Sequence, residues 1–476
     1  MVAYSNKEKP FKMFDESVRL DGVLEITDKG IYGFGIADWE DAQLTSKRFK
    51  FNAEELLADT ASLLIKTIDG DKVTFNTPNV NAYVDFNENT GYFKSNTNEN
   101  RTEFNFNQYA TTIDEFFWDI DNKQIQFSVP EGSNGAPFVS LRLDQDTLSF
   151  IATKADYNLE NSIIEASGVS EIFVADSRVI PDKGKVTIYP EAKMGTLTNA
   201  VIEASGESKR HIIENVTITI NGKYAIKATG NYKYNAKNTL TQYINLPVID
   251  VIIADSTQMD KKNGVVTKII HGKGFIPQSE NFIIYPDVQY YGDVDLYSTM
   301  NALKIKGFTK VDFKSPYIVS DFFQVEGKVD PDSLDLTLDG AKDPTGKLIR
   351  TGIFVNKIGI NPIYTNILNN QIGPLDVSLF EANGILKHNS LLNLYTFGNE
   401  VKMSSERVMK GNVLKFSPKD NTLVGQGSFD FALAYGAIDE KFAGEVRTDL
   451  IENNYNFKTS IIVPFDLDKS VIDKIA

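Results

Sequence analysis

The chain has 476 residues, a formal net charge of −15 and no cysteine. Single hydrophobic cores stop growing at roughly 250–300 residues, so more than one packed unit, or one long repetitive body, is expected. The absence of cysteine excludes disulfides, thiolate metal sites and a cysteine nucleophile. Basic residues form no long cluster in this acidic chain, which argues against nucleic acid as a partner.

The beginning of the chain carries no targeting signal that we recognise. Residues Met1 to Pro10 lack the apolar region of a signal peptide. No run of about 18 apolar residues occurs anywhere, so no transmembrane helix is predicted. Strand-like sequence starts at Phe11, and the chain stops just after an apolar stretch at Ile475-Ala476. We therefore expect this chain to be a fragment of a longer protein.

Composition and periodicity favour β-strands throughout. The chain has 31 Phe and 20 Tyr against 2 Trp, and it is rich in Val, Ile and Thr. Short segments with alternating apolar residues are separated by turn signals such as Asp28-Lys29-Gly30 and Pro181 to Gly184. Such frequent turns build hairpins rather than βαβ units. The predicted fold class is all-β: an elongated β-jellyroll or β-solenoid-like stack of antiparallel strands and hairpins, with very little helix.

Residues 215–228 contain the clearest predicted hairpin. Val216, Ile218 and Ile220 share one face of a strand, and the intervening threonines point to the other face. Asn221-Gly222 supplies the residue types of a type I′ turn. We therefore predict the turn at these two residues.

Few segments favour helix. Asn52 to Leu64 has leucines at helical spacing but lies between strand-like segments, so helix and strand both remain open. Short helices are predicted for Ser298 to Leu303 and for Asp468 to Ile475. None of these segments carries a chemical motif.

Two polar, turn-rich stretches suggest domain boundaries. The first lies around Gln242 to Gly274 and the second around Asp330 to Gly346. They predict an elongated β-rich body over residues 1–245, a β-rich middle segment over 246–330 and a C-terminal β-rich unit over 331–476.

The three histidines, His211, His271 and His388, are far apart in the sequence and have no zinc-ligand spacing. We expect each to be a surface or strand residue. No Gly-x-Ser-x-Gly motif is present. Adjacent carboxylates are common among 64 acidic residues, and neighbours on a strand point to opposite faces. The sequence therefore predicts no catalytic, cofactor-binding or metal-binding residue, and we expect no enzyme.

Two further groups of residues have an ordinary structural interpretation. Asp119 to Asn122 and Val329 to Ser333 resemble calcium loops but lack the closing bidentate Glu, so they are predicted to be Asx turns. The aromatic residues in 104–109 and 116–118 could line a sugar or lipid groove. A buried core is the favoured interpretation, because each ring buries a large area.

Several segments resemble long, uncharacterised exported β-rich proteins of Bacteroidetes-type bacteria. The resemblance includes Lys9 to Asp15, Leu20 to Leu24, Asn79 to Asp85, Phe116 to Asp119 and Arg350 to Phe354. It covers most of the chain and supports the interpretation as a fragment. It implies a location in the cell envelope, periplasmic or associated with the outer membrane. It implies no site residue.

A second, looser resemblance concerns Ala155 to Gly168. This stretch is similar to the recurring unit of the lipopolysaccharide-transport and organic-solvent-tolerance family. Members of that family form open, elongated β-jellyrolls with an apolar lumen. The resemblance therefore implies stacked short strands around an apolar interior.

The expected function is that of a non-enzymatic cell-envelope protein, either a structural scaffold or a lipid-conducting element. Its expected partners are lipid or other envelope proteins. The alternatives are an extracellular carbohydrate-binding or carbohydrate-active protein and an outer-membrane β-barrel. If a lipid path exists, its predicted lining includes Val80, Tyr83, Val84, Phe86, Val186, Ile188, Val216, Ile218 and Ile220. That these residues form an ordinary core remains the alternative.

Overall fold

The computed structural model describes residues 1–39, 41–67, 72–97, 100–112, 115–130, 132–204, 211–237, 239–255, 267–356, 358, 362–405, 410–431 and 441–462. It consists of 63% strand and 3% helix, in large antiparallel sheets. The all-β prediction is therefore confirmed. No helix in these ranges has the length and apolar character needed to cross a membrane.

The chain divides into two compact units rather than the three regions expected from the sequence. Unit 1 comprises Met1–Lys233, Leu246–Gly272 and Tyr297–Thr299, and unit 2 comprises Tyr234–Asn245, Lys273–Leu296 and Met300–Ala476. The expected middle segment, 246–330, is thus shared between the units. Strands β23, β24, β25 and β27 each contribute residues to both units.

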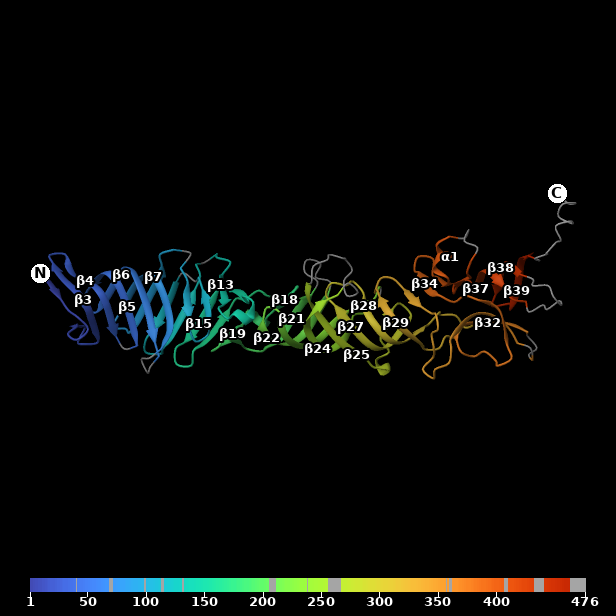
Figure 1. Ribbon diagram of the computed structural model, residues 1–476, viewed down its shortest axis with the longest axis horizontal. Coiled ribbons are helices and arrows are strands. Elements are labelled where there is room, and N and C mark those ends of the chain that lie inside the picture. Colours follow the sequence, from blue (N-terminus) through green and yellow to red (C-terminus); the bar gives the residue numbers. More distant parts are fainter. Residues whose placement is uncertain are drawn as a thin grey trace, which may run out of the picture. The chain divides into compact units, whose positions relative to one another are not determined.

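Unit 1 contains most of the strands, and they follow one another in chain order (Figure 1). They are β1 (Val2–Tyr4), β2 (Phe11–Met13), β3 (Val18–Thr27), β4 (Gly30–Trp39), β5 (Ala42–Phe51), β6 (Glu55–Lys66), β7 (Val73–Asp85), β8 (Thr90–Ser95), β9 (Thr102–Phe104), β10 (Tyr109–Thr111), β11 (Glu115–Asp119), β12 (Gln124–Ser128), β13 (Ala136–Ser140), β14 (Ser149–Ala152), β15 (Lys154–Asn158), β16 (Ile163–Ser167), β17 (Ile172–Val174), β18 (Ser177–Ile180), β19 (Val186–Tyr189), β20 (Lys193–Met194), β21 (Leu197–Ala204), β22 (His211–Gly222), β23 (Ala225–Tyr234), β24 (Gln242–Ala254) and β25 (Thr267–Ile276). Two short 3₁₀ helices, η1 (Leu143–Gln145) and η2 (Asp182–Gly184), interrupt them.

Strands β5, β6 and β7 are long, and each changes its alternation once. In β5, Ala42, Leu44 and Ser46 are buried, two exposed residues follow, and burial resumes at Phe49 and Phe51. The register of β5 with β4 shifts at the same place. A bulge adds one residue and so restores the same face to the interior. One side of each long strand therefore stays buried along its length, with Ser46 of β5 and Thr77 of β7 among its buried polar residues.

After β7 the long strands are replaced by pairs of short ones. The Val80–Asp85 part of β7 pairs with β8, whereas Phe75 and Asn76 pair with β9. Two antiparallel ladders continue from this fork. Wall A is β8-β11-β12-β15-β16-β19, and wall B is β9-β10-β13-β14-β17-β18-β21. The chain thus adds a hairpin to one wall and then crosses to the other.

Unit 2 is built from antiparallel strands of the second half of the chain. Its elements are β26 (Ile283–Tyr285), β27 (Val288–Tyr297), β28 (Leu303–Val311), β29 (Phe323–Val329), β30 (Asp335–Thr337), β31 (Arg350–Val355), β32 (Ile363–Asn369), β33 (Val377–Glu381), β34 (Ile385–Asn389), β35 (Leu394–Gly398), β36 (Val413–Ser417), β37 (Thr422–Phe429), β38 (Lys441–Asp449) and β39 (Asn454–Ile462), with the 3₁₀ helix η4 (Gln278–Glu280) and the helix α1 (Glu400–Ser404).

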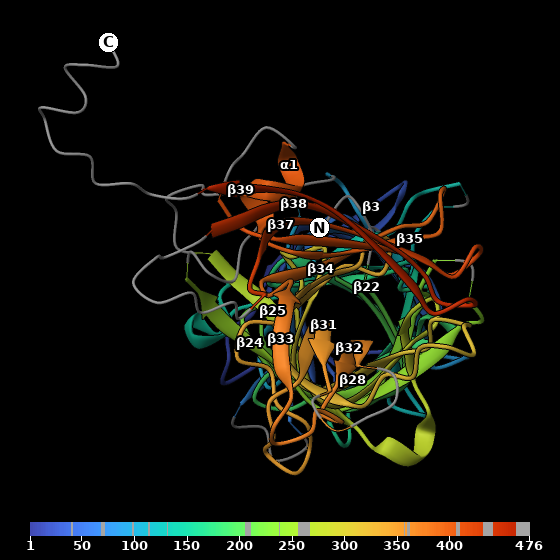
Figure 2. The same ribbon diagram turned by 90° about the vertical axis from the view of Figure 1, so that its right-hand side faces the viewer.

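Two sheets of unit 2 are separate from the β27-β28-β29 meander. One has seven strands in the order β30-β34-β35-β36-β37-β38-β39, and the other has three in the order β32-β31-β33. Figure 2 shows the larger sheet with β34, β35, β37, β38 and β39 side by side. Phe313 packs on this sheet, with its ring 4.8 Å from that of Tyr395 and 5.6 Å from that of Phe416.

The helix predictions fail where the structure describes them. Glu55–Lys66 is strand β6, so the open choice for Asn52 to Leu64 resolves as strand. Leu56 and Leu63, seven residues apart, are both buried because the strand contains a bulge after Ala58. Ser298 to Leu303 forms a turn that leads into β28, not a helix. The predicted helix from Asp468 to Ile475 lies outside the described residues.

The predicted hairpin is present as β22 and β23, but the turn is two residues later than expected. Lys223 and Tyr224 form the turn, and Gly222 pairs with Ala225 across the strands. Gly222 is explained by packing against another loop and not by the turn. A Cβ atom at Gly222 would lie 3.1 Å from the Cα of Gln145, so the close approach of a second loop leaves little room for a side chain here.

Candidate functional site: the apolar interior of unit 1

The predicted lining residues all belong to unit 1, but they do not form one surface. Seven point inward and are 0–1% exposed: Val80, Val84, Val186, Ile188, Val216, Ile218 and Ile220. Tyr83 is only half-buried and points outward, where its hydroxyl donates to Glu55 Oε1 at 2.9 Å. Phe86 is also half-buried, and its ring stacks on that of Phe14 at 4.7 Å. Alternation within β7 puts Tyr83 on the face opposite Val80 and Val84.

Aromatic rings fill the interior between residues 39 and 157, which we call the aromatic segment. The rings that are at most 4% exposed are Trp39, Phe49, Phe51, Phe75, Phe93, Phe104, Tyr109, Phe116, Trp118, Phe127, Phe138, Phe150 and Tyr157. Many of these residues lie in the two clusters of 104–109 and 116–118 for which the sequence favoured a core. That interpretation is confirmed for Phe104, Tyr109, Phe116 and Trp118, whereas Phe117 is 38% exposed.

Several of these rings touch across the interior from opposite walls. Phe104 of wall B lies 5.4 Å from Phe127 and 5.0 Å from Tyr157, both in wall A. Nearer the start of unit 1, the rings of Trp39 and Trp118 are 6.1 Å apart. These are contact distances for aromatic pairs. The two walls are therefore in direct contact here, and side chains occupy the space between them.

The interior changes character between residues 163 and 228, which we call the aliphatic segment. Its described hydrophobic residues that are at most 7% exposed include no ring: Ile164, Ala166, Val169, Ile172, Val174, Val179, Val186, Ile188, Ala192, Met194, Leu197, Ala200, Ile202, Ala204, Ile213, Val216, Ile218, Ile220, Ile226 and Ala228. The aromatic residues of the segment point away from this core. Phe173 and Tyr189 are 54% and 39% exposed, and Tyr224 lies under the ammonium group of Lys268 at 4.1 Å.

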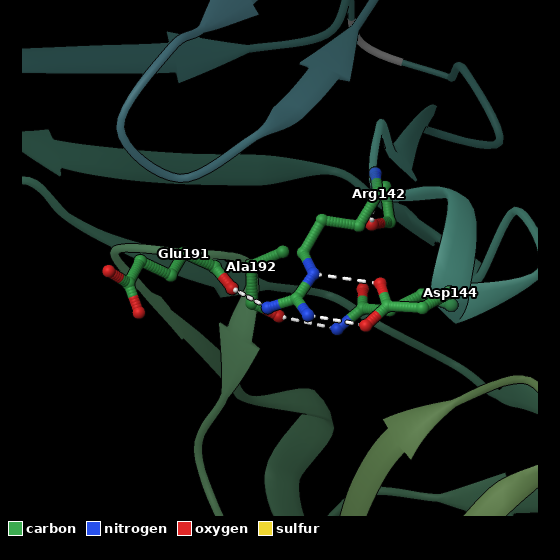
Figure 3. A network of polar contacts seen from close by, with 6 residues as sticks. Arg142, Asp144, Glu191 and Ala192 are labelled. Atoms are coloured by element: carbon green, nitrogen blue, oxygen red, sulfur yellow. Dashed lines mark hydrogen bonds and ion pairs between the residues drawn. The ribbon is translucent and has the colours of Figure 1, made fainter.

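Hydrogen bonds connect the walls at their loops. The guanidinium of Arg142 donates through Nε to Asp144 Oδ1 at 2.8 Å and through Nη1 to the carbonyl of Glu191 at 2.9 Å (Figure 3). The side-chain amide of Gln145 donates through Nε2 to the carbonyl of Ala192 at 2.9 Å. The hydrogen bond and charge of Arg142 lower the pKa of the Asp144 carboxyl. This network joins the loop of η1 to the turn before β20, and its charged groups are paired with each other.

A second polar group ties three distant segments of unit 1 together. Asp176, in the turn after β17, accepts a hydrogen bond from the Ile270 amide at 2.9 Å and another from the Ser298 hydroxyl. Burial raises the pKa of the Asp176 carboxyl. His271 lies next in the chain, and its Nδ1 is 3.2 Å from Asp250 Oδ1. The Ser298 hydroxyl donates its hydrogen bond to the Asp176 carboxylate. This hydrogen bond joins two segments of unit 1, which is a structural role.

Each histidine lies in a strand, as expected, and each has a tyrosine neighbour that the sequence did not predict. His211 Nδ1 is 3.0 Å from the Tyr232 hydroxyl on the adjacent strand, and the ring of His271 stacks on that of Tyr297 at 4.8 Å. In unit 2, His388 Nδ1 is 3.2 Å from the Tyr285 hydroxyl, and burial lowers the pKa of this imidazole. His211 meets Tyr232 across the paired strands β22 and β23, whereas His388 and Tyr285 come from different sheets, and sequence spacing encodes neither contact.

No metal site is apparent in the part of the chain that the structure describes. Among these described residues, no group of three or more His, Asp or Glu side chains is arranged to hold an ion. Asp119 accepts hydrogen bonds from the backbone and side-chain nitrogens of Asn122 at 3.0 and 2.8 Å. Asp330 likewise accepts from the Asp332 amide at 2.9 Å. The prediction of Asx turns is confirmed at both places.

Some buried polar atoms of the aromatic segment lack a protein partner. Asn107 donates to the carbonyls of Ser162 and Ile188 at 2.7 and 3.1 Å, but its Oδ1 accepts nothing, and neither does Oε1 of Gln145. The hydroxyl of Tyr109 is also unpaired, and burial raises the pKa of its phenol. Buried water commonly satisfies such atoms.

Neither the models of protein families nor the curated proteins gave a match to the chain.

Proposed function

We propose that this chain is a non-enzymatic structural protein of the cell envelope, a scaffold whose unit 1 has a closed apolar core. The observation that carries the proposal is the contact between rings of opposite walls. Phe104 meets both Phe127 and Tyr157 across the interior. An open lipid path would need a continuous space where these side chains meet.

The polar groups of unit 1 support a structural role. Arg142 and Asp144 are paired with each other, and Asp176 holds the Ile270 amide and the Ser298 hydroxyl. A catalytic site usually keeps an acid, base or nucleophile directed at a cleft. These groups instead join segments of unit 1: Arg142 also donates to the carbonyl of Glu191, and Asp176 connects the turn after β17 to β25 and to Ser298. The location in the envelope is supported by the resemblance of the sequence to exported proteins.

A lipid-conducting element is the second candidate function, and the aliphatic segment favours it. Its buried hydrophobic side chains are aliphatic or Met194, and Phe173 and Tyr189 lie outside. Aliphatic side chains adjust to an acyl chain more easily than stacked rings do. This candidate requires the walls to separate around Ile188 and Ile218, which are 0% exposed.

Native mass spectrometry of the purified chain, with lipid extraction from the same sample, separates the two candidates. A scaffold with a closed core gives the mass of the polypeptide alone and an extract without acyl lipid. A conduit gives co-purifying lipid in near-equal molar amount. That lipid should be lost in Ile218→Asp and kept in the matched control Thr217→Asp, because Thr217 points outward and is exposed.

A further inference from the structure

A cleft on the outside of the aliphatic segment has a different character from the rest of this acidic surface. It lies where the chain crosses from β20 of one wall to β21 of the other. Its lining comes from η2, from the outward face of β19 and from the crossing segment: Asp182, Lys183, Lys185, Thr187, Tyr189, Gly195, Thr196, Leu197 and Thr198. We call it the β19–β21 cleft.

Two ammonium groups and several hydroxyls line this cleft. Lys183 and Lys185 are exposed and form no ion pair with any described residue. Thr187 and Tyr189 project from the same outward face of β19, and Thr196 shares a hydrogen bond with Thr219 at 3.2 Å. The one lining carboxylate, Asp182, accepts a hydrogen bond from the Asn199 side chain at 3.4 Å. The cleft thus combines two positively charged donors with hydroxyls and a single carboxylate.

Gly195 gives the cleft its depth. Its amide donates to the carbonyl of Thr187 at 2.8 Å, which holds the crossing segment against β19. A Cβ atom at this position would lie 3.4 Å from Thr187 and from the Tyr189 ring, an ordinary contact distance. A larger side chain would therefore extend into the cleft without first displacing backbone. The glycine keeps space open between the lysines and the threonines.

We propose that the β19–β21 cleft binds a phosphate group, carried by a lipid headgroup or by a free phosphate. A phosphate offers several acceptor oxygens and up to two negative charges, which suits two ammonium groups and neighbouring hydroxyls. The net charge of −15 opposes anion binding over the chain as a whole, so a phosphate site needs local positive charge such as these two lysines. The cleft would thus give the chain an anchoring point for phosphate-bearing material. This inference does not depend on whether the interior is open or closed.

Titration calorimetry of the full chain with inorganic phosphate, at constant ionic strength, tests the proposal. The double variant Lys183→Gln/Lys185→Gln should weaken binding about tenfold or more, since both charge-assisted contacts are lost. Gly195→Leu should weaken it similarly without any change of charge. The matched control Lys29→Gln/Lys50→Gln removes the same charge from exposed positions elsewhere in unit 1 and should bind as the original chain does.

Sedimentation with vesicles distinguishes the two sources of phosphate. Binding to phosphatidylcholine vesicles that contain phosphatidic acid, lost in the Lys183→Gln/Lys185→Gln variant, identifies a lipid headgroup. Calorimetric binding without vesicle binding identifies a free phosphate. The proposal is overturned if neither phosphate nor phosphatidic acid binds. It is also overturned if the control variant loses as much affinity as the lysine variant. Thermal unfolding of each variant verifies its fold, and the lysine substitutions remain decisive if Gly195→Leu does not fold.

Discussion

The aromatic and aliphatic segments of unit 1 share one backbone plan but have different interiors. Both place hairpins alternately in wall A and wall B, with antiparallel pairing throughout. In the aromatic segment, rings such as Phe104 and Tyr157 meet across the interior at 5.0 Å. In the aliphatic segment, buried residues such as Ile188 and Ile218 are branched or small. The same strand arrangement therefore encloses two kinds of core, and the buried side chains determine how strongly the two walls interact.

The largest effect is expected for Phe104→Ala. This fully buried ring contacts Phe127 and Tyr157 in the other wall, so its removal leaves a cavity where the walls meet. We expect the free energy of unfolding to fall by about 3–5 kcal/mol, as measured by urea unfolding. Phe117→Ala is the control, because Phe117 points outward, and it should cost less than about 1 kcal/mol. Equal losses in the two variants would contradict a core joined by rings.

A smaller loss is expected for Ile218→Ala in the aliphatic segment. Ile218 is fully buried but lies among aliphatic side chains that can adjust to the cavity. The same unfolding experiment should show a loss of about 2–4 kcal/mol. Thr219→Ala, one residue away on the outer face, should change stability by about 0.5 kcal/mol or less. A negligible effect of Ile218→Ala would indicate that this interior is loosely filled.

Gly222→Ala tests the contact between the β22–β23 hairpin and the loop of η1. The added Cβ would lie 3.1 Å from Gln145 Cα and 3.4 Å from the carbonyl oxygen of Asp144, and both are backbone atoms. We expect a loss of about 1–2 kcal/mol, seen as a lower midpoint of thermal unfolding. Gly195→Ala, whose Cβ would make only ordinary contacts, should leave the midpoint nearly unchanged. The prediction fails if the two alanine variants behave alike.

The smallest effect concerns pH and Asp176. Burial raises the pKa of this carboxyl in the folded state above its value in the unfolded chain. The folded state therefore binds the proton of Asp176 more tightly than the unfolded chain does. The stabilisation that results is fully present below the unfolded pKa and is lost as the pH rises through the folded pKa. Compared with the original chain, Asp176→Asn should show a smaller gain in stability as the pH is lowered from about 7 to 4.

Urea-unfolding midpoints across this pH range give the measurement. Asp28→Asn, at an exposed turn, is the control and should keep the pH profile of the original chain. An unchanged profile for Asp176→Asn would show that this carboxyl does not contribute to the pH dependence.

The sequence predicted what depends on local alternation and missed what depends on register. Turn signals and alternating Val and Ile were enough to predict an all-β chain and the inward face of Val216, Ile218 and Ile220. The bulges in β5 to β7 cannot be predicted from composition, because one extra residue shifts the phase of everything after it. That shift explains why Asn52 to Leu64 also matched a helical spacing.

Contacts between distant loops account for the remaining differences. Gly222 has the residue type of a turn, yet the neighbouring loop at Gln145 explains it better. The Asp176 and Ser298 hydrogen bond joins residues far apart in the chain, and no motif predicts it. The β19–β21 cleft combines residues from η2, β19 and the segment before β21. Such sites become visible only when the strands are paired.

Thiol accessibility tests the closed interior of unit 1 most directly. The chain contains no cysteine, so Ile218→Cys and Thr219→Cys each introduce a single thiol with no background. The account predicts that the thiol at position 218 reacts with a water-soluble reagent at least about 100-fold more slowly than the one at 219, because it requires local opening. Similar rates at the two positions would show an interior open to solvent and would contradict the closed core.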